Sequence, residues 1–233
     1  MSQIATLLND SFTVDTKPHL HCINNPSYIV RMTPMKTSRV QYDIILAHVA
    51  RFVSLTADEK KFFCSLLTLK KVRKRQFVLQ AGDVAQYDFF VTKGCLRAYY
   101  IDESGAERIV QFALEGWWIG DMASFTGGTP ALFTIDALED SEIFLIDRRG
   151  WDLLFERIPK FERFFRLLLQ NAFVAFQRRI LSHLAGSAEE RYTELIRRYP
   201  GFAKRIPLRH IASYLGVTPE FLSRMRKKML AKK

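Results

Sequence analysis

The sequence has few cysteines, few helix- and strand-breaking residues, and no long apolar run. Its three cysteines, Cys22, Cys64 and Cys95, are odd in number and widely separated, which excludes a disulfide framework and favours a reducing compartment. Only 11 Gly and 8 Pro occur in 233 residues, which excludes a collagen-like or disordered chain. No run approaches the roughly 18 to 20 uncharged apolar residues of a membrane span. Because Met1–Asp10 has neither a basic start nor an apolar stretch, we expect no signal peptide, no membrane partner and a cytoplasmic location.

What the chain does contain is apolar residues and positive charge. Hydrophobic residues make up 48%, with 19 Phe, enough for a thick core in one large domain or two small ones. The formal net charge is +11, and residues 187–233 contribute 12 basic against 4 acidic residues. A basic C-terminal module on a nearly neutral body indicates a polyanionic partner, nucleic acid before membrane. The alternative is a tail that only keeps the chain in solution.

Residues 1–37 show no sustained period and are rich in Ser, Thr, Asn and Pro, so we interpret them as an N-terminal extension, with disorder as one reading. His19, His21 and Cys22 lie close together, but a structural zinc site needs four ligands and no second cluster supplies the rest. An ordinary solvated segment is therefore favoured and no metal is assigned. Met35 is a candidate second start, because the organised pattern begins just after it.

Residues 38–159 are predicted to form a β-rich effector domain. Two short helices are expected between Val40 and Leu69, the second opened by a capping box of Thr56 and Glu59. Beyond Lys70, short β-type runs alternate with turn signals, which is typical of an antiparallel sandwich or barrel. The expected strands are Phe77–Gln80, Tyr87–Thr92, Leu96–Ile101, Arg108–Ala113, Phe133–Leu138 and Glu142–Ile146.

Residues 160–186 are predicted to form one long helix with two apolar stripes. The first stripe steps at helical spacing through Phe165, Leu169, Ala172, Phe176 and Ile180, and the second through Phe161, Leu168 and Ala175. Two stripes imply two partners. One is the β domain, and the other is interpreted as the same helix of a second subunit, so that Phe165, Leu169, Ala172 and Phe176 are the dimerisation residues. The alternative is a helix buried inside a monomer.

Residues 187–233 are predicted to contain a helix-turn-helix. After a helix at Ala188–Tyr199, a short helix has Ile211, Ala212 and Leu215 on its inner face, followed by the turn residue Gly216. Thr218 is the expected N-cap of the next helix, with Pro219 at its first position. Phe221, Leu222 and Met225 are expected to face inward.

The outer face of that second helix suits DNA. Glu220, Ser223, Arg224 and Lys227 are expected to project outward. Arg224 can donate two hydrogen bonds to guanine, and Glu220 can accept one from cytosine. Arg209, Arg226, Lys227 and Lys228 suit phosphates. The alternative is a plain helical hairpin without a nucleic-acid partner.

Together, a β-rich domain, a long helix and a C-terminal helix-turn-helix resemble the Crp-Fnr family of bacterial transcription regulators, from about residue 40 to residue 233. The resemblance implies an α+β fold: a cyclic-nucleotide-binding-like β jelly roll (double-stranded β-helix), a dimerisation helix and a helix-turn-helix domain. Ile119-Gly120-Asp121-Met122-Ala123 looks like the family's phosphate-binding cassette. Glu220 and Arg224 fall where the family places its base-reading Glu and Arg.

The chain also departs from the family pattern. The Arg-Ser or Arg-Thr pair that neutralises a cyclic phosphate falls on Ala131 and Leu132, and a buried phosphate without a cation is strongly disfavoured. We therefore expect no cofactor and no cAMP binding, with another small-molecule effector or none. Arg97 and Arg108 are interpreted as surface charge, with another anion as the alternative. Only five residues follow Lys228, so no β-hairpin wing is expected, and Pro219 stands where the family often has an Arg. The cysteines do not reproduce the N-terminal cluster of the iron-sulfur members.

The leading hypothesis is a homodimeric, sequence-specific regulator that binds double-stranded DNA, with RNA polymerase as a further partner. The alternative is a ligand-binding module whose basic end docks a protein or RNA. The sequence contains no G-x-S-x-G, Walker A or H-E-x-x-H motif, so no enzyme activity is predicted.

Overall fold

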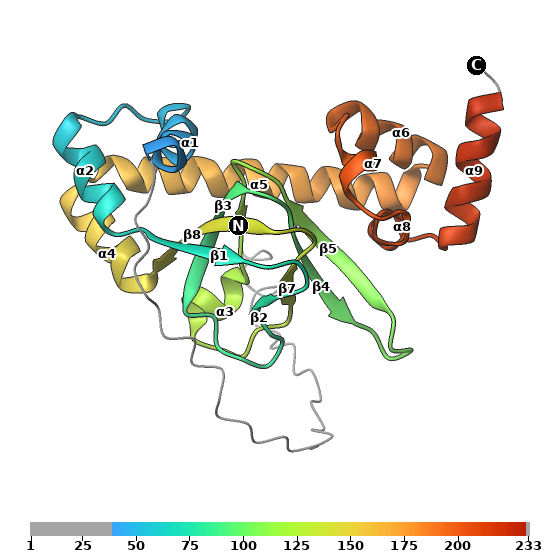
Figure 1. Ribbon diagram of the computed structural model, residues 1–233, viewed down its shortest axis with the longest axis horizontal. Coiled ribbons are helices and arrows are strands. Elements are labelled where there is room, and N and C mark those ends of the chain that lie inside the picture. Colours follow the sequence, from blue (N-terminus) through green and yellow to red (C-terminus); the bar gives the residue numbers. More distant parts are fainter. Residues whose placement is uncertain (1–38, 232–233) are drawn as a thin grey trace, which may run out of the picture. The chain divides into compact units, whose positions relative to one another are not determined.

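The computed structural model describes residues 39–231 (Figure 1). The predictions made for residues 1–37, including His19, His21, Cys22 and Met35, fall on residues outside this range. The described helices are α1 (Arg39–Ala50), α2 (Ala57–Ser65), α3 (Met122–Gly127), α4 (Arg148–Arg157), α5 (Lys160–Ala185), α6 (Ala188–Arg198), α7 (Phe202–Arg205), α8 (Leu208–Leu215) and α9 (Pro219–Ala231). The strands are β1 (Thr68–Val72), β2 (Phe77–Leu79), β3 (Tyr87–Lys93), β4 (Leu96–Ile101), β5 (Glu107–Ala113), β6 (Trp118–Ile119), β7 (Thr134–Ala137) and β8 (Ser141–Asp147).

The strands form two four-stranded antiparallel sheets, in the orders β1-β8-β3-β6 and β2-β7-β4-β5. Apart from the β4–β5 hairpin, neighbours in each sheet are far apart in sequence, so this is a double-sheet jelly roll and not a meander of hairpins. The predicted antiparallel architecture is confirmed. All six predicted strands exist, and Leu96–Ile101 has the predicted bounds.

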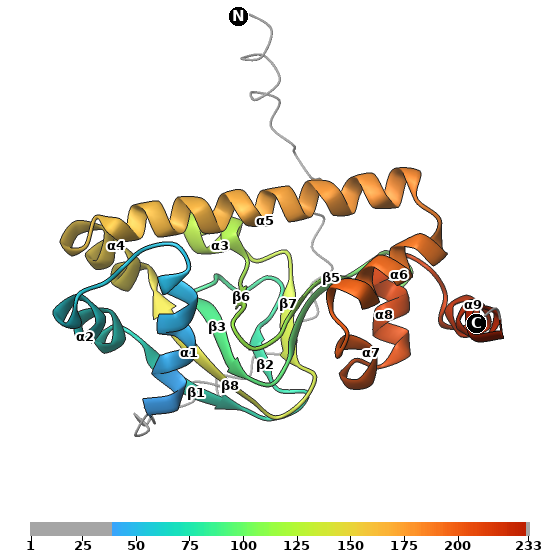
Figure 2. The ribbon, with the colours of Figure 1, turned by 90° about the horizontal axis from the view of Figure 1, so that it is seen from above.

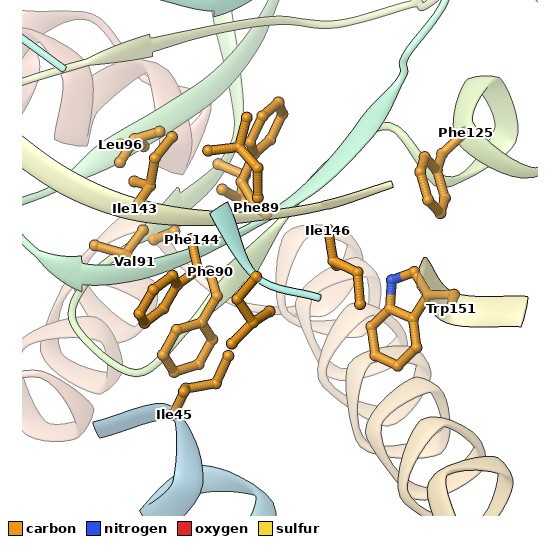
Figure 3. Close-up of a cluster of buried hydrophobic side chains, with 14 of the residues drawn as sticks. Ile45, Phe89, Phe90, Val91, Leu96, Phe125, Ile143, Phe144, Ile146 and Trp151 are labelled. Carbon is orange, nitrogen blue, oxygen red and sulfur yellow. The ribbon is translucent and has the colours of Figure 1, made fainter. Parts of the chain in front are cut away.

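The main core lies between the sheets and under the helices α1, α4 and α5. Phe90, Ile143 and Phe144 are fully buried, and Figure 3 shows Ile45 of α1 beside Phe90 and Phe144. Residues 88–92 of β3 are buried at every position, as a strand covered on both faces should be. The abundance of Phe thus serves the thick interior that composition predicted.

Five elements were not predicted: β1, β6, α3, α4 and α7. β1 reads T-L-K-K-V, and its two buried residues, Leu69 and Val72, are three positions apart, so the strand shows no alternation of buried and exposed residues. β6 has two residues. α4 is interrupted by Gly150, a poor helix former, yet Asp147 caps it by accepting from the Gly150 N–H at 2.7 Å. The predicted capping box at Thr56 and Glu59 is present in α2, with Thr56 N donating to Glu59 Oε2 at 2.7 Å.

The long helix α5 has the predicted bounds, Lys160–Ala185, and in both ribbon views it passes alongside the strands before α6 begins (Figures 1 and 2). Phe161 and Phe164 are fully buried and Leu168 packs against the same core, so the first half of α5 is held by the jelly roll.

A second hydrophobic cluster joins the jelly roll to the C-terminal helices. From β4 and β5 it takes Tyr99, Ile109 and Phe112, and from the helices it takes residues including Phe202 and Leu215. The ring of Phe112 lies 5.0 Å from that of Phe202 and 5.4 Å from that of Tyr214. The helices α7 and α8 therefore pack against β5.

Candidate functional site

The helix-turn-helix is built as predicted. α8 ends at Gly216, whose φ of +69° is left-handed and costs glycine nothing, and the Val217 N–H returns to the Ala212 carbonyl at 3.0 Å. Thr218 begins α9, because its Oγ1 accepts from the Phe221 N–H at 3.2 Å. Leu222, fully buried, and Met225 hold α9 against α8.

The outer face of α9 presents most of the predicted DNA-binding side chains to solvent. Thr218, Glu220, Arg224, Lys227 and Lys228 are exposed, and Ser223 is half-buried. Arg209, on α8, is exposed as well. On the exposed face of α9, Glu220 and Arg224 thus lie one helical turn apart.

Two side chains of α9 lie differently from the prediction. Phe221, expected to face inward, is 43% exposed, because Leu222 and Met225 already fill the inner positions. Arg226, expected to reach a phosphate, is half-buried with its guanidinium 5.8 Å from the ring centre of Tyr192 on α6. Neither position followed from helical spacing alone, because the packing of α6 decides which edge of α9 is covered.

Arg97 joins β4 to α8, and its interpretation as surface charge is wrong. The side chain is 7% exposed, donates to Asp136 Oδ1 at 2.7 Å and Oδ2 at 2.9 Å, and also pairs with Glu107. Its Nη1 lies 3.1 Å from Nδ1 of His210 on α8. Burial, and then the charges of Arg97 and Arg209, lower the pKa of His210 to about 4, so at neutral pH an uncharged ring faces the guanidinium. Arg108, by contrast, is exposed and pairs with Asp102.

The free edge of β5 is covered by α8 and α5. Ser213 Oγ accepts from the Ile109 N–H at 3.0 Å and donates to the Glu107 carbonyl at 2.6 Å. Arg179 of α5 donates to the carbonyls of Ile109, at 3.0 Å, and Val110, and to that of Tyr214 on α8 at 3.3 Å. An edge strand left bare would expose these groups. The helix α8 is therefore attached to the jelly roll by hydrogen bonds between side chains and backbone groups as well as by apolar contact.

The predicted cassette lies between β6 and β7, and its carboxylate is already bound within the chain. Asp121 is 1% exposed and caps α3 by accepting from the Ser124 N–H at 3.1 Å. Its Oδ2 accepts from the amides of Leu132 at 2.7 Å and Phe133 at 3.3 Å. These amides lie at the end of the cassette where the family resemblance places the residues for the cyclic phosphate. Asp121 thus supplies an internal anion to them.

The rest of the cassette is small or apolar. Residues 120–133 include no Lys, Arg or His. Ala131 is buried, whereas Leu132 is 66% and Met122 38% exposed, and Ala123 is exposed. At Gly120 a Cβ would come 2.8 Å from Oδ1 of Asp88, so a larger residue there would have to displace the Asp88 carboxyl group. Burial raises the pKa of Asp88 to about 7, so a second carboxyl, not a cation, stands behind the cassette.

The second half of α5 carries an unpartnered apolar stripe. Leu169, Phe176 and Ile180 are 39%, 53% and 43% exposed, and the predicted Ala172 is exposed beside them. Phe173 and Leu184, which the sequence pattern did not single out, extend the stripe at 61% and 79% exposure. Phe165 is the exception, because its ring packs against Trp151 at 5.1 Å, so the accessible stripe begins at Leu169.

Among the described residues, no helix is both long and apolar enough to span a bilayer. Between residues 39 and 231 no three His, Cys, Asp or Glu side chains gather as a metal site. Cys64 and Cys95 are free thiols, and burial raises the pKa of Cys95 to about 12.

Comparison with known proteins agrees with this architecture. Residues 69–157 match the cyclic nucleotide-binding domain. The chain is 32% identical over 167 residues to the regulatory protein HlyX of Actinobacillus pleuropneumoniae, covering 67% of this chain and 69% of HlyX. It is 30% identical to the fumarate nitrate reduction regulatory protein of Klebsiella oxytoca, covering 67% of this chain and 66% of that protein. The match spans about two thirds of the length of these curated relatives.

Solved structures share the fold. The c-di-GMP-responsive global regulator CLP of Xanthomonas campestris aligns with a TM-score of 0.63 at 16% identity, covering 76% of this chain and 93% of CLP. FixK2 of Bradyrhizobium japonicum aligns with a TM-score of 0.61 at 21% identity, covering 71% and 85%.

A cyclic-nucleotide-binding-type jelly roll followed by a long helix and a helix-turn-helix defines the class of transcription regulators that join an effector domain to a DNA-binding motif. Within that class, the chain belongs to the Crp-Fnr family.

Proposed function

We propose that this regulator acts as a homodimer that binds a two-fold symmetric DNA site through α9, and that its jelly roll does not respond to cAMP. The observation that carries the first part is the exposed outer face of α9, where Glu220 and Arg224 stand among cations. The exposed stripe of α5 supports the dimer, because an apolar surface of this kind needs a partner. We place this activity in the cytoplasm, with RNA polymerase as the further partner of the DNA-bound protein.

Selecting bound fragments from a random DNA pool tests the proposal. Two α9 helices, one per half-site, should select half-sites about 34 Å apart, one helical turn of DNA. Selection of no DNA would leave the alternative, a ligand-binding module that docks a protein or RNA.

At the selected site, Arg224→Ala should cost on the order of 1 to 3 kcal/mol and relax discrimination at one symmetric pair of bases, because the variant cannot make the forked hydrogen bonds to guanine. Binding of specific and random duplexes by fluorescence anisotropy measures both effects. If Arg224→Ala weakens specific and random DNA equally, Arg224 binds phosphate and its base-reading role is wrong.

Lys227→Ala and Arg209→Ala are the matched comparison, since both side chains are exposed cations of the same motif. They should weaken all sequences alike, because a phosphate carries no sequence information. The slope of log K against log salt should fall by about one unit for each phosphate that is no longer neutralised in a half-site.

The second part of the proposal rests on Asp121 and Ala131. A cyclic phosphate entering the cassette would meet an internal carboxylate and no cation, so its charge would be unpaired. Calorimetry should therefore detect no cAMP binding at physiological concentrations. Micromolar affinity would contradict this expectation.

Replacing Ala131 with Arg and Leu132 with Ser should raise the affinity for cAMP, since the pair supplies the missing cation and hydroxyl. Adding Asp121→Ala should raise it further, because the Leu132 and Phe133 amides are then free to donate to the phosphate. Arg97 is unavailable for this role, because Asp136 and Glu107 already bind its guanidinium.

A further inference from the structure

Phe221 is an exposed aromatic side chain on a face otherwise made of charged groups. It lies in the first turn of α9, where Thr218 Oγ1 fixes its backbone N–H at 3.2 Å. The Phe221 side chain is 43% exposed, because Leu222, at 0% exposure, and Met225 occupy the inward-facing positions of α9. The ring is held out by the helix geometry.

The position of Phe221 places it in line with the predicted DNA contacts. Residues three and seven positions apart lie on one side of a helix, so Phe221, Arg224 and Lys228 form a single row along α9. All three are exposed. The N-terminal residues of a recognition helix are those that reach base edges, and Phe221 is in that first turn. Lys228, two turns further, is better placed for a phosphate.

The groups present in the major groove determine what the Phe221 ring can contact. A phenyl ring neither donates nor accepts a conventional hydrogen bond, and it gains nothing from a phosphate. The one apolar group on a base edge in the major groove is the C5-methyl of thymine. We infer that Phe221 reads this methyl group and makes a thymine a specificity determinant in each half-site. This inference rests on the proposed DNA binding by α9.

Deoxyuridine provides the test, because it pairs like thymine and lacks only the methyl group. In the duplex obtained by selection, each symmetric thymine pair is replaced in turn by deoxyuridine, and binding of the full-length protein is measured by anisotropy. Deoxyuridine at one of these thymine pairs should weaken wild-type binding by about fourfold per half-site. This is the factor expected when one methyl group loses its apolar contact. Phe221→Ala should bind the thymine and deoxyuridine duplexes equally, while Phe221→Leu should keep part of the difference.

Leu230→Ala is the matched control, since Leu230 is an apolar residue of α9 that is 71% exposed at the far end of the helix. It should keep the full wild-type preference for thymine. Retention of the preference by Phe221→Ala, or its absence in the wild type, would overturn the inference while leaving DNA binding intact. In either case the ring has another role, such as binding a protein. The wild-type comparison needs no variant to fold. A wild-type protein that selects no DNA would remove the proposed function itself, and the inference with it.

Discussion

A protein carrying Phe176→Glu should sediment as a monomer at micromolar concentrations where the wild type sediments as a dimer. Phe176 is 53% exposed within one chain, so the substitution leaves the core of the subunit intact. In a two-fold pair of α5 helices it would place two like charges opposite each other, in a seam formed with Leu169, Phe173 and Ile180. Burying such charges without partners should weaken association at least about a hundredfold.

Asn171→Glu is the control for this result. It adds the same charge to an exposed position of α5, five residues away and therefore on a different side of the helix from Phe176. Sedimentation velocity should show it as a dimer. A wild type that is already monomeric at micromolar concentration would refute the assignment of this stripe as the subunit interface.

Arg97→Met should lower the free energy of unfolding by about 3 kcal/mol, which is a large fraction of the stability of a domain. The substitution keeps the length of the side chain and leaves the carboxylate of Asp136, 8% exposed, without its partner. The value is at the lower end for a broken buried pair, because the second partner, Glu107, is 42% exposed and can be solvated. Urea unfolding followed by circular dichroism measures the change.

Two further variants show whether the broken ion pair is the cause. Adding Asp136→Asn to Arg97→Met should recover part of the stability, because no uncompensated buried charge remains. Arg108→Met, on the neighbouring strand β5, removes the ion pair between an exposed arginine and Asp102 in the β4–β5 turn and should have little effect. A loss of stability as large in Arg108→Met as in Arg97→Met would contradict a specific role for the buried ion pair.

Periodicity and cap residues predicted much of this fold. The bounds of α5, the capping box at Thr56 and the turn at Gly216 follow from local rules, so the sequence sufficed for them. The order of strands in the two sheets did not follow, because pairing β8 with both β1 and β3 depends on contacts between distant segments. β1 was missed because its two buried residues are three positions apart and show no alternation, and β6 was missed because it has only two residues.

In the candidate site, the sequence predicted which residues lie on the outer face of α9, except for Phe221 and Arg226. Helical spacing placed Glu220, Arg224 and Lys227 outside, but only the packing of α6 and α8 shows that Phe221 is uncovered and Arg226 is covered. Arg97 gave no signal, because nothing in a strand's alternation marks a guanidinium that meets a carboxylate 39 residues away. Buried ion pairs between distant segments are set by tertiary structure.

Asp121 bears on how such a domain would be controlled. A carboxylate attached to the same chain is always present at the Leu132 and Phe133 amides, and a short tether gives it an effective concentration on the order of millimolar or more. A dissolved anion would have to displace this tethered carboxylate to reach the two amides. It is at a disadvantage, because its own concentration changes with metabolism whereas that of the carboxylate is constant. Signals that change the abundance of the protein itself, or the occupancy of another surface, would not have to compete with Asp121. The amount of regulator in the cell then becomes the variable to measure first.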